Sequence, residues 1–226
     1  MCREVQKEIA PQCKNEDEKN QTYIKKLDED LKNYYAELKR RPFFQYTTGV
    51  EKSQELISMV GQEIVQFEEK IADYGYIASK FGSQDVMNNS IKQVDQIKNE
   101  CENMRIFWEH TGKMQDLYEG YMNSKWIETS PFDMEEDVKA LNKQVKEMKV
   151  DKKCNAYFGI IDDTKKWLVF LPLISELRDE AMRPRHWDAI KEKVQKQFEV
   201  NESLLLRDVF NLNLNKYQED VEEITD

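Results

Sequence analysis

The two histidines are the side chains of this sequence best suited to acid–base or metal chemistry near neutral pH. His110 follows Phe107-Trp108-Glu109, and His186 stands between an arginine and a tryptophan. Neither has a glutamate three residues before it, the spacing used by helical di-metal sites. The four cysteines, Cys2, Cys13, Cys101 and Cys154, show no CxxC spacing. We therefore interpret both histidines as packing residues and the cysteines as reduced thiols.

Motifs for phosphate binding or nucleophilic catalysis are equally weak. The string nearest to a P-loop is Thr111-Gly112-Lys113-Met114, where the first glycine position falls on Phe107 and the hydroxyl position is Met114. Pairs of neighbouring acidic residues are expected by chance in a chain with 44 Asp and Glu residues. The alternation of Asn211, Asn213 and Asn215 lacks the Asp-rich start, the central glycine and the closing glutamate of an EF-hand calcium loop. The acidic pairs are Glu135-Glu136, Asp162-Asp163 and Glu222-Glu223. We predict no catalytic, cofactor-binding or metal-ligating residue in this chain.

The composition favours a helical protein. The 226 residues include only 7 Gly and 5 Pro, and their mean hydropathy of -0.82 suits helices that bury one stripe each. The net charge of -10 argues against nucleic acid and anionic membranes as partners. Because no apolar run is long enough for a bilayer span or a signal peptide, we expect a soluble intracellular protein.

Apolar residues at steps of three and four predict the elements that position these side chains. After a fraying segment over residues 1–19, the first helix runs from about residue 21 to Pro42, the second over residues 57–74, and the third over residues 87–108. The third can extend to Tyr121, although Gly112 and Gly120 can break or kink it. The stripes are Ile24, Leu27, Leu31, Tyr34 and Leu38; Ile57, Val60, Ile64, Phe67, Ile71 and Tyr74; and Met87, Ile91, Val94, Ile97 or Lys98, Cys101, Met104 and Trp108.

The second half of the chain predicts shorter helices. Ser130-Pro131 is a candidate helix start with Asp133 as a rival cap, followed by the stripe Val138, Leu141, Val145 and Met148. A fifth helix from about Cys154 to Leu171 or beyond has Phe158, Ile161, Trp167, Leu168 and Leu171 inward, and Pro172 should kink or end it. A sixth helix begins at Pro184 and includes Trp187, Ile190, Val194 and Phe198. Residues 201–214 are predicted to form a short helix and a connector, and another helix is predicted to begin near Lys216. The predicted fold is all-α, with elongated antiparallel helical bundle segments stacked end to end.

Residues 171–187 read LPLISELRDEAMRPRHW, which resembles the LPLI…L…AMR.RHW signature of dynein heavy chains. Three other segments, residues 104–108, 124–135 and 204–214, also resemble this family, so the resemblance covers roughly residues 100–226. We call residues 171–187 the signature segment. Its matching residues, which we expect to form a structural junction, are Leu171, Pro172, Leu173, Leu177, Met182, Arg185, His186 and Trp187.

This resemblance implies a mechanical piece of a very large motor. Residues 1–99 would be long helices at the boundary of tail and linker, and residues 100–226 the N-terminal part of the linker. The piece itself would transmit force without catalysis, while the parent chain would use ATP and Mg in an AAA+ ring to move along microtubules toward their minus ends. The partners implied are that ring, intermediate and light chains, and the microtubule. The variant of the signature resembles axonemal heavy chains, which implies the cytoskeleton of a cilium or flagellum.

A linker that bends needs hinges, for which three candidates are Gly82-Ser83, residues 112–120 and residues 183–187. We expect the arginines of the last one to bind neighbouring carboxylates. These arginines are Arg178, Arg183 and Arg185, and the carboxylates are Asp179, Glu180 and Asp188. Two other classes stay open: a stand-alone spectrin-like helical scaffold, and an all-α enzyme with an acidic metal site. The heptad stripes likewise fit either an intramolecular core or a coiled coil with a partner helix.

Overall fold

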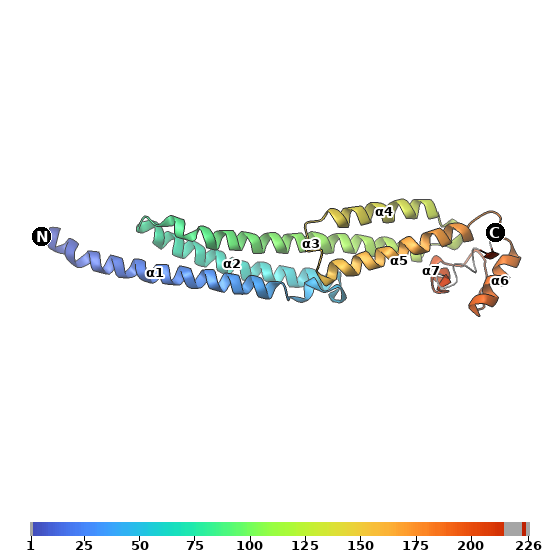
Figure 1. The fold of residues 1–226 in the computed structure, drawn as a ribbon, viewed down its shortest axis with the longest axis horizontal. Helices are drawn as coiled ribbons and strands as arrows, with labels where there is room; N and C mark the ends of the chain where they lie inside the picture. The colour runs from blue at the N-terminus through green and yellow to red at the C-terminus, as the bar shows by residue number, and fades with distance from the viewer. Residues whose placement is uncertain (1, 215–222, 225–226) are drawn as a thin grey trace. The chain divides into compact units, whose positions relative to one another are not determined.

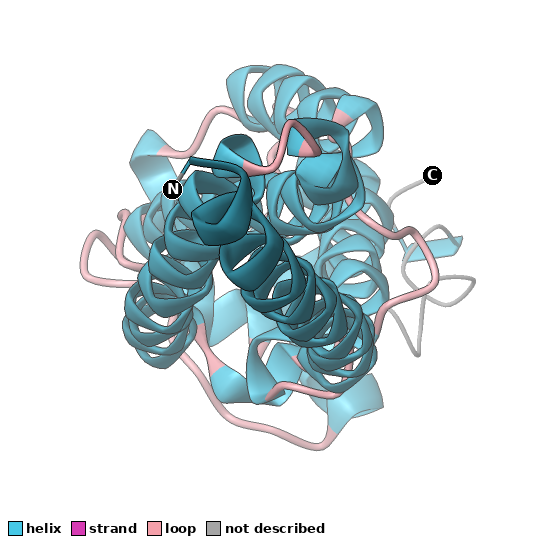
Figure 2. Ribbon diagram, turned by 90° about the vertical axis from the view of Figure 1, so that its left-hand side faces the viewer, coloured by secondary structure: helices cyan, strands magenta, loops and turns pink. Residues whose placement is uncertain are grey.

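A computed structural model describes residues 2–214 and 223–224 of the chain. Its α-helices are α1 (Cys2–Leu38), α2 (Val50–Lys80), α3 (Asn88–Met122), α4 (Pro131–Glu147), α5 (Asn155–Leu177), α6 (Pro184–Val194) and α7 (Leu206–Phe210) (Figure 1). Short 3-10 turns are η1 (Pro42–Phe44), η2 (Tyr46–Thr48), η3 (Gln84–Met87) and η4 (Trp126–Glu128). Figure 2 shows helices joined by loops throughout the described residues. The predicted all-α bundle fold is confirmed, and the end-to-end stacking stays a prediction.

The chain divides into two compact units, Met1–Trp108 and Glu109–Asp226, and α3 contributes residues to both. Each unit is described by itself below. The predicted boundary between residues 99 and 100 concerns functional regions of a motor and stays a prediction. Within the described residues, every helix is too short or too polar to cross a bilayer.

In the first unit, α1, α2 and the start of α3 share a core built from the predicted stripes. The buried apolar side chains are Ile24, Leu27, Leu31 and Leu38 of α1, Ile57, Val60 and Ile64 of α2, and Val94, Ile97, Cys101, Met104, Phe107 and Trp108 of α3. At the turn after α1, Trp108 Nε1 donates a buried hydrogen bond of 2.8 Å to the Phe43 carbonyl oxygen. Because this bond joins residues far apart in the chain, it fixes the turn against α3.

Two predictions for this unit were wrong. The first helix begins at Cys2 instead of near residue 21, because charged pairs such as Lys14–Glu18 support an exposed helix without any apolar stripe. Ile91, predicted to be inward, is 42% exposed. The second stripe also weakens toward its end, where Ile71 and Tyr74 are only half-buried.

In the second unit, α4 and α5 lie side by side (Figure 1). The predicted cap of α4 is confirmed, since Ser130 Oγ accepts from the Asp133 N–H at 3.4 Å and Pro131 occupies the first turn. The rival cap at Asp133 was therefore wrong. The predicted starts of α6 at Pro184 and of a short helix, α7, after residue 201 are confirmed. The helix predicted from Lys216 falls almost wholly outside the described residues.

The predicted extension of the third helix to Tyr121 is confirmed, whereas complete breaks at Gly112, Gly120 and Pro172 are not found. Neither Gly112 nor Gly120 interrupts α3, so residues 112–120 are no hinge between helices. Pro172 does not end α5, which continues to Leu177. Phe158 is 58% exposed, because the buried face of α5 instead starts from Tyr157. The buried residues of α5 are Ala156, Tyr157, Ile160, Thr164, Trp167, Phe170, Leu171, Leu173, Ile174 and Leu177.

Candidate functional site

The signature segment spans the second half of α5, a connection over residues 178–183 and the first turn of α6. Leu171, Leu173 and Leu177 are each at most 3% exposed and belong to the core of the second unit. Pro172 and Arg185 are exposed, while Met182 and His186 are half-buried. The matching residues therefore divide into a buried set, which packs α5, and a set that remains accessible.

Trp187 anchors the first turn of α6. Its ring meets Trp126 of η4 edge to face, with 6.0 Å between ring centroids and 86° between ring planes. Phe198, beyond the end of α6, contacts Trp187 in the same manner at 6.0 Å. Both tryptophans are buried, with Trp126 3% and Trp187 8% exposed. Edge-to-face pairs add about 0.5–1.5 kcal/mol beyond the burial of their area. Two aromatic partners thus fix the orientation of α6.

Backbone hydrogen bonds tie Trp126 to a third segment. Its N–H donates to the Leu204 carbonyl oxygen at 2.7 Å, and the Leu206 N–H donates to the Ser124 carbonyl oxygen at 3.0 Å. These two bonds flank an isolated antiparallel bridge between Lys125 and Leu205. The segment before α4 and the segment before α7 are thereby joined.

Arg178, at the end of α5, completes the arrangement. Its Nη2 donates to the Ile127 carbonyl oxygen at 2.9 Å, and its guanidinium carbon lies 5.8 Å from the centre of the Trp126 ring. A guanidinium over a tryptophan face at this distance is a cation–π contact. We call Trp126, Arg178, Trp187, Phe198 and the Lys125–Leu205 bridge the joint.

The prediction that the arginines bind carboxylates was wrong. Arg178 Nη2 donates to a backbone oxygen, and so does Arg183 Nη1, which lies 2.6 Å from the Glu180 carbonyl oxygen. The carboxylates have nearer partners: Asp179 Oδ1 accepts from the Ala181 N–H at 2.7 Å, and Asp188 pairs with Lys191 at 3.0 Å. Local bonds along the chain thus occupy the acids before the arginines reach them.

His186 forms hydrogen bonds at the start of its own helix, α6. Its Nδ1 lies 3.3 Å from the Arg183 N–H nitrogen, and its Nε2 lies 2.9 Å from Arg185 Nε. A neutral imidazole accepts at one nitrogen only, so these two donors compete for one acceptor. The ring therefore caps α6 or holds Arg185, but not both at once.

A second aromatic cluster surrounds Trp167 of α5. Tyr118 stacks on its ring at 4.8 Å between centroids, and Phe210 of α7 lies at 6.0 Å from it. Phe170 meets Phe210 edge to face at 4.7 Å. The spacing of Trp167 and Phe170 on one helix face signals such a cluster in the sequence. The contact with Phe210 has no such local signal.

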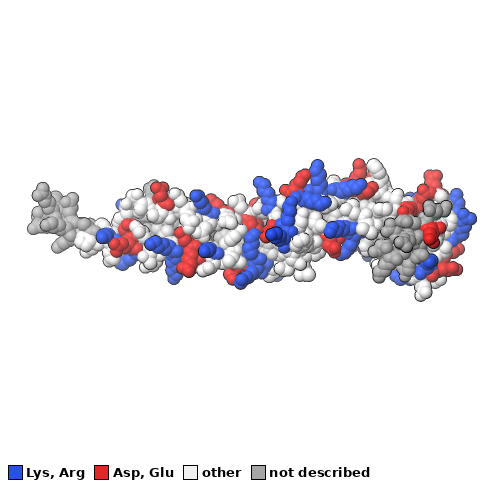
Figure 3. Space-filling model, in the orientation of Figure 1, with Lys and Arg blue, Asp and Glu red and all other residues white. Residues whose placement is uncertain are grey.

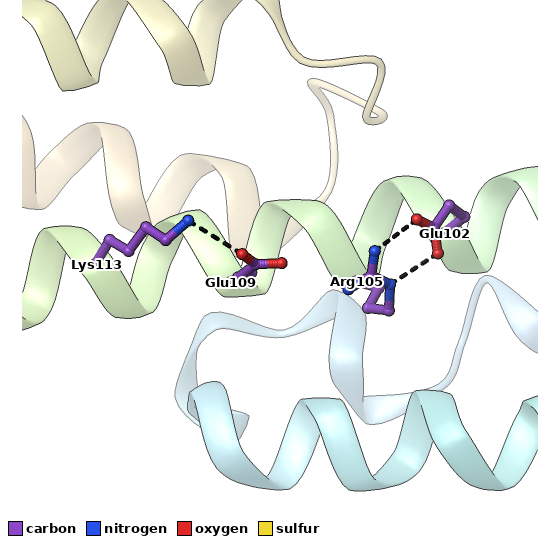
Figure 4. Close-up of polar contacts among 4 residues, drawn as sticks. All are labelled: Glu102, Arg105, Glu109 and Lys113. Atoms are coloured by element: carbon purple, nitrogen blue, oxygen red, sulfur yellow. Dashed lines mark hydrogen bonds and ion pairs between the residues drawn. The ribbon is translucent and has the colours of Figure 1, made fainter.

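The chemistry-bearing residues outside the signature segment are placed as packing or surface residues. His110 is 7% exposed, its Nε2 lies 3.3 Å from the Leu141 carbonyl oxygen, and burial lowers its pKa. Lys113, of the near P-loop string, pairs with Glu109 along α3 at 3.0 Å (Figure 4). Because Gly112 and Lys113 lie inside a continuous helix, their N–H groups face along the helix and do not form a phosphate cradle.

The cysteines and the acidic residues give no metal site in the described part of the chain. Burial raises the pKa of the Cys101 thiol to about 11, whereas Cys13 is exposed and Cys154 half-buried. No group of three or more His, Cys, Asp or Glu side chains within the described residues is arranged to hold a metal ion. The joint is thus the most specific arrangement of signature residues, and its contacts are those of packing.

Comparison with protein families gives this arrangement a context. The sequence model of the dynein heavy chain, N-terminal region 2, matches residues 94–226, which include the whole signature segment and the joint. The chain belongs to the dynein heavy chain family. The predicted membership is confirmed, and the region matched begins close to where the sequence resemblance begins.

Several dynein heavy chains similar to this one carry axonemal, flagellar or ciliary names. The dynein alpha chain of the flagellar outer arm of Chlamydomonas reinhardtii is 26% identical over 99% of this chain. Dynein axonemal heavy chain 17 of Mus musculus is 29% identical over 60% of it, and the ciliary dynein beta chain of Tripneustes gratilla 26% identical over 73%. This dynein heavy chain sequence spans only 5%, 3% and 4% of the length of these relatives. The axonemal assignment made from the signature is confirmed.

Proposed function

We propose that this chain is a force-transmitting part of an axonemal dynein heavy chain and carries no catalysis of its own. In this proposal residues 100–226 form the N-terminal part of the linker, and the ATP and Mg sites lie elsewhere in the motor. Partners of the motor would be its own AAA+ ring, intermediate and light chains, and the microtubule. Family membership favours this function over a stand-alone spectrin-like scaffold.

The joint is the observation that supports a mechanical role. A lever transmits force only where its segments cannot slide past one another, and close-packed contacts resist such sliding. At the joint, Trp187 of α6, Arg178 of α5 and the Leu204 carbonyl oxygen all contact Trp126 or its backbone. Trp126 therefore holds two later segments of the chain: the signature segment, which supplies two of the contacts, and the segment before α7.

The test is a motility assay on a complete axonemal heavy chain with Trp126→Ala at this position. We expect slower microtubule gliding while ATP turnover continues, because a loose joint loses displacement without changing the ATP sites. Phe132→Ala is the matched control, since that aromatic ring is 68% exposed. Unchanged gliding in the Trp126 variant would overturn the mechanical role. Saturable ATP binding to the 226-residue chain itself would overturn its non-catalytic assignment.

A further inference from the structure

A strip of lysines follows the C-terminal end of α4. Lys143 and Lys146 lie on the helix, and Lys149, Lys152 and Lys153 lie on the connection to α5. All five side chains are exposed. Figure 3 shows Lys and Arg side chains gathered over this end of α4. We call these five residues the basic strip; within residues 143–153 they outnumber the two carboxylates, Glu147 and Asp151.

Among the described residues, other lysines without an ion pair, such as Lys32, Lys92 and Lys165, are spread along the chain, whereas the five strip lysines lie within residues 143–153. Elsewhere, cations repeatedly pair with an acid three or four residues away, as Arg105 does with Glu102 and Lys113 with Glu109 (Figure 4). Lys139, one turn before the strip, pairs with Glu135 at 2.7 Å in this manner. Within the described residues, no carboxylate lies within 4.0 Å of any strip lysine. The strip therefore presents five lysines without a direct ion pair, and an excess of local positive charge, on a protein of net charge -10.

Folding alone does not account for the strip. The dipole of α4 favours a cation in its last turn, which explains Lys146. It does not explain Lys149, Lys152 or Lys153, which lie beyond the helix. Lys143 and Lys146 are three residues apart on one helix face, where like charges repel. One carboxylate oxygen of Asp151, Oδ1, already accepts a hydrogen bond of 2.9 Å from the backbone N–H of Lys153, and not from a lysine side chain. Such repulsion is relieved when an anionic partner binds.

We propose that the basic strip is a docking surface for an acidic peptide segment of a partner protein. A short extended peptide rich in Asp and Glu can follow a strip of this length and place a carboxylate beside each lysine. Nucleic acid fits poorly, since domains that bind it typically have a pI above about 9, whereas the pI of this chain is about 5.0. A membrane also fits poorly, because interfacial helices insert an apolar face. The apolar residues of α4, Met134, Val138 and Val145, are instead buried within the second unit.

The test measures binding of a fluorescein-labelled ten-residue polyglutamate to the 226-residue chain by fluorescence anisotropy. One variant replaces the five strip lysines by Gln, and a matched variant replaces five other exposed lysines by Gln, so that both lose the same charge. The matched lysines are Lys25, Lys26, Lys32, Lys92 and Lys165. We expect the strip variant to bind the peptide about thirtyfold more weakly. Each exposed lysine–glutamate ion pair contributes roughly a factor of two to affinity, and five such pairs are lost. The matched variant should bind within about threefold of the original chain, a change that non-specific charge screening can produce.

Three results would overturn the proposal. Equal weakening in both variants would mean that only net charge matters. No polyglutamate binding by the original chain at 50 mM salt would remove the docking surface altogether. Stronger strip-dependent binding to a ten-residue oligouridine, or to vesicles containing phosphatidylserine, would assign the strip to a different partner. Circular dichroism of both variants verifies that helix content is unchanged, as expected for exposed side chains. The proposal does not depend on the mechanical function proposed above.

Discussion

Replacing Trp187 by alanine removes the residue through which α6 contacts the joint. The side chain is 8% exposed and makes two edge-to-face contacts, with Trp126 and Phe198. Truncating a buried tryptophan costs about 3–5 kcal/mol, because apolar burial is lost and a cavity remains. At about 2–4 °C per kcal/mol for a chain of this size, the melting temperature should fall by roughly 6–20 °C.

Differential scanning calorimetry measures this change, and hydrogen exchange shows where it acts. The amides of α6 and of η4 should exchange faster in the variant, whereas those of α1 should not, since they belong to the other unit. Phe132→Ala, at a ring that is 68% exposed, should change stability by less than about 0.5 kcal/mol. A Trp187→Ala variant with unchanged melting temperature and unchanged exchange in α6 would refute the assignment of Trp187 as the anchor of that helix.

Three further predictions follow from buried polar groups. Trp108→Phe removes the donor to the Phe43 carbonyl oxygen and should cost about 1–3 kcal/mol in urea unfolding, because that oxygen stays buried and unpaired. Burial lowers the pKa of His110 in the folded chain, so the unfolded chain binds a proton at this residue more readily than the folded chain does. The free energy of unfolding should therefore fall as the pH is lowered from 7.5 to 5.5. His110→Leu should reduce this pH dependence. The Cys101 thiol, with its pKa raised to about 11, should react with iodoacetamide at pH 8 far more slowly than exposed Cys13, as peptide mass spectrometry can measure.

Each of these has a clear contrary outcome. Equal urea midpoints for the Trp108 variant and the original chain would show that the indole bond contributes nothing. A pH profile that His110→Leu leaves unaltered would show that other groups titrate in this range. Equal alkylation rates of Cys101 and Cys13 would show that the packing around Cys101 opens readily.

The core of the first unit was predictable because its pattern is local. Leu27, Leu31 and Leu38 recur at helical spacing, and each is at most 2% exposed. The same reasoning missed about the first five turns of α1, where no apolar stripe exists and charged pairs stabilise the helix. Periodicity finds the buried face of a helix, but it does not find helices that have none.

Helix breaks were harder to predict than helix faces. Pro172 and Gly112 both disfavour a helix intrinsically, yet each lies inside one. Propensity is a weak constraint compared with tertiary packing. The burial of the apolar side chains around Pro172 compensates α5 for the hydrogen bond that Pro172 cannot make. These side chains are Phe170, Leu171, Leu173, Ile174 and Leu177. The sequence around Phe158 is apolar on several faces, so the register of α5 was ambiguous by one residue.

The joint could be anticipated only through family resemblance. Trp126 and Leu204 are far apart in the sequence, and no spacing rule indicates that their backbones are hydrogen-bonded. The resemblance identified Trp187 as important but did not identify its aromatic partners. Contacts between distant segments depend on the path of the whole chain, which local patterns do not contain.

Within the signature segment, folding explains some matching residues and leaves others unexplained. Leu171, Leu173 and Trp187 are buried, so their packing is sufficient reason for their side-chain types. Pro172 and Arg185 are exposed, and Pro172 removes a helix hydrogen bond that Ala would keep. Stability therefore does not require either residue. Their accessible side chains are therefore the part of the signature that packing within this chain does not explain.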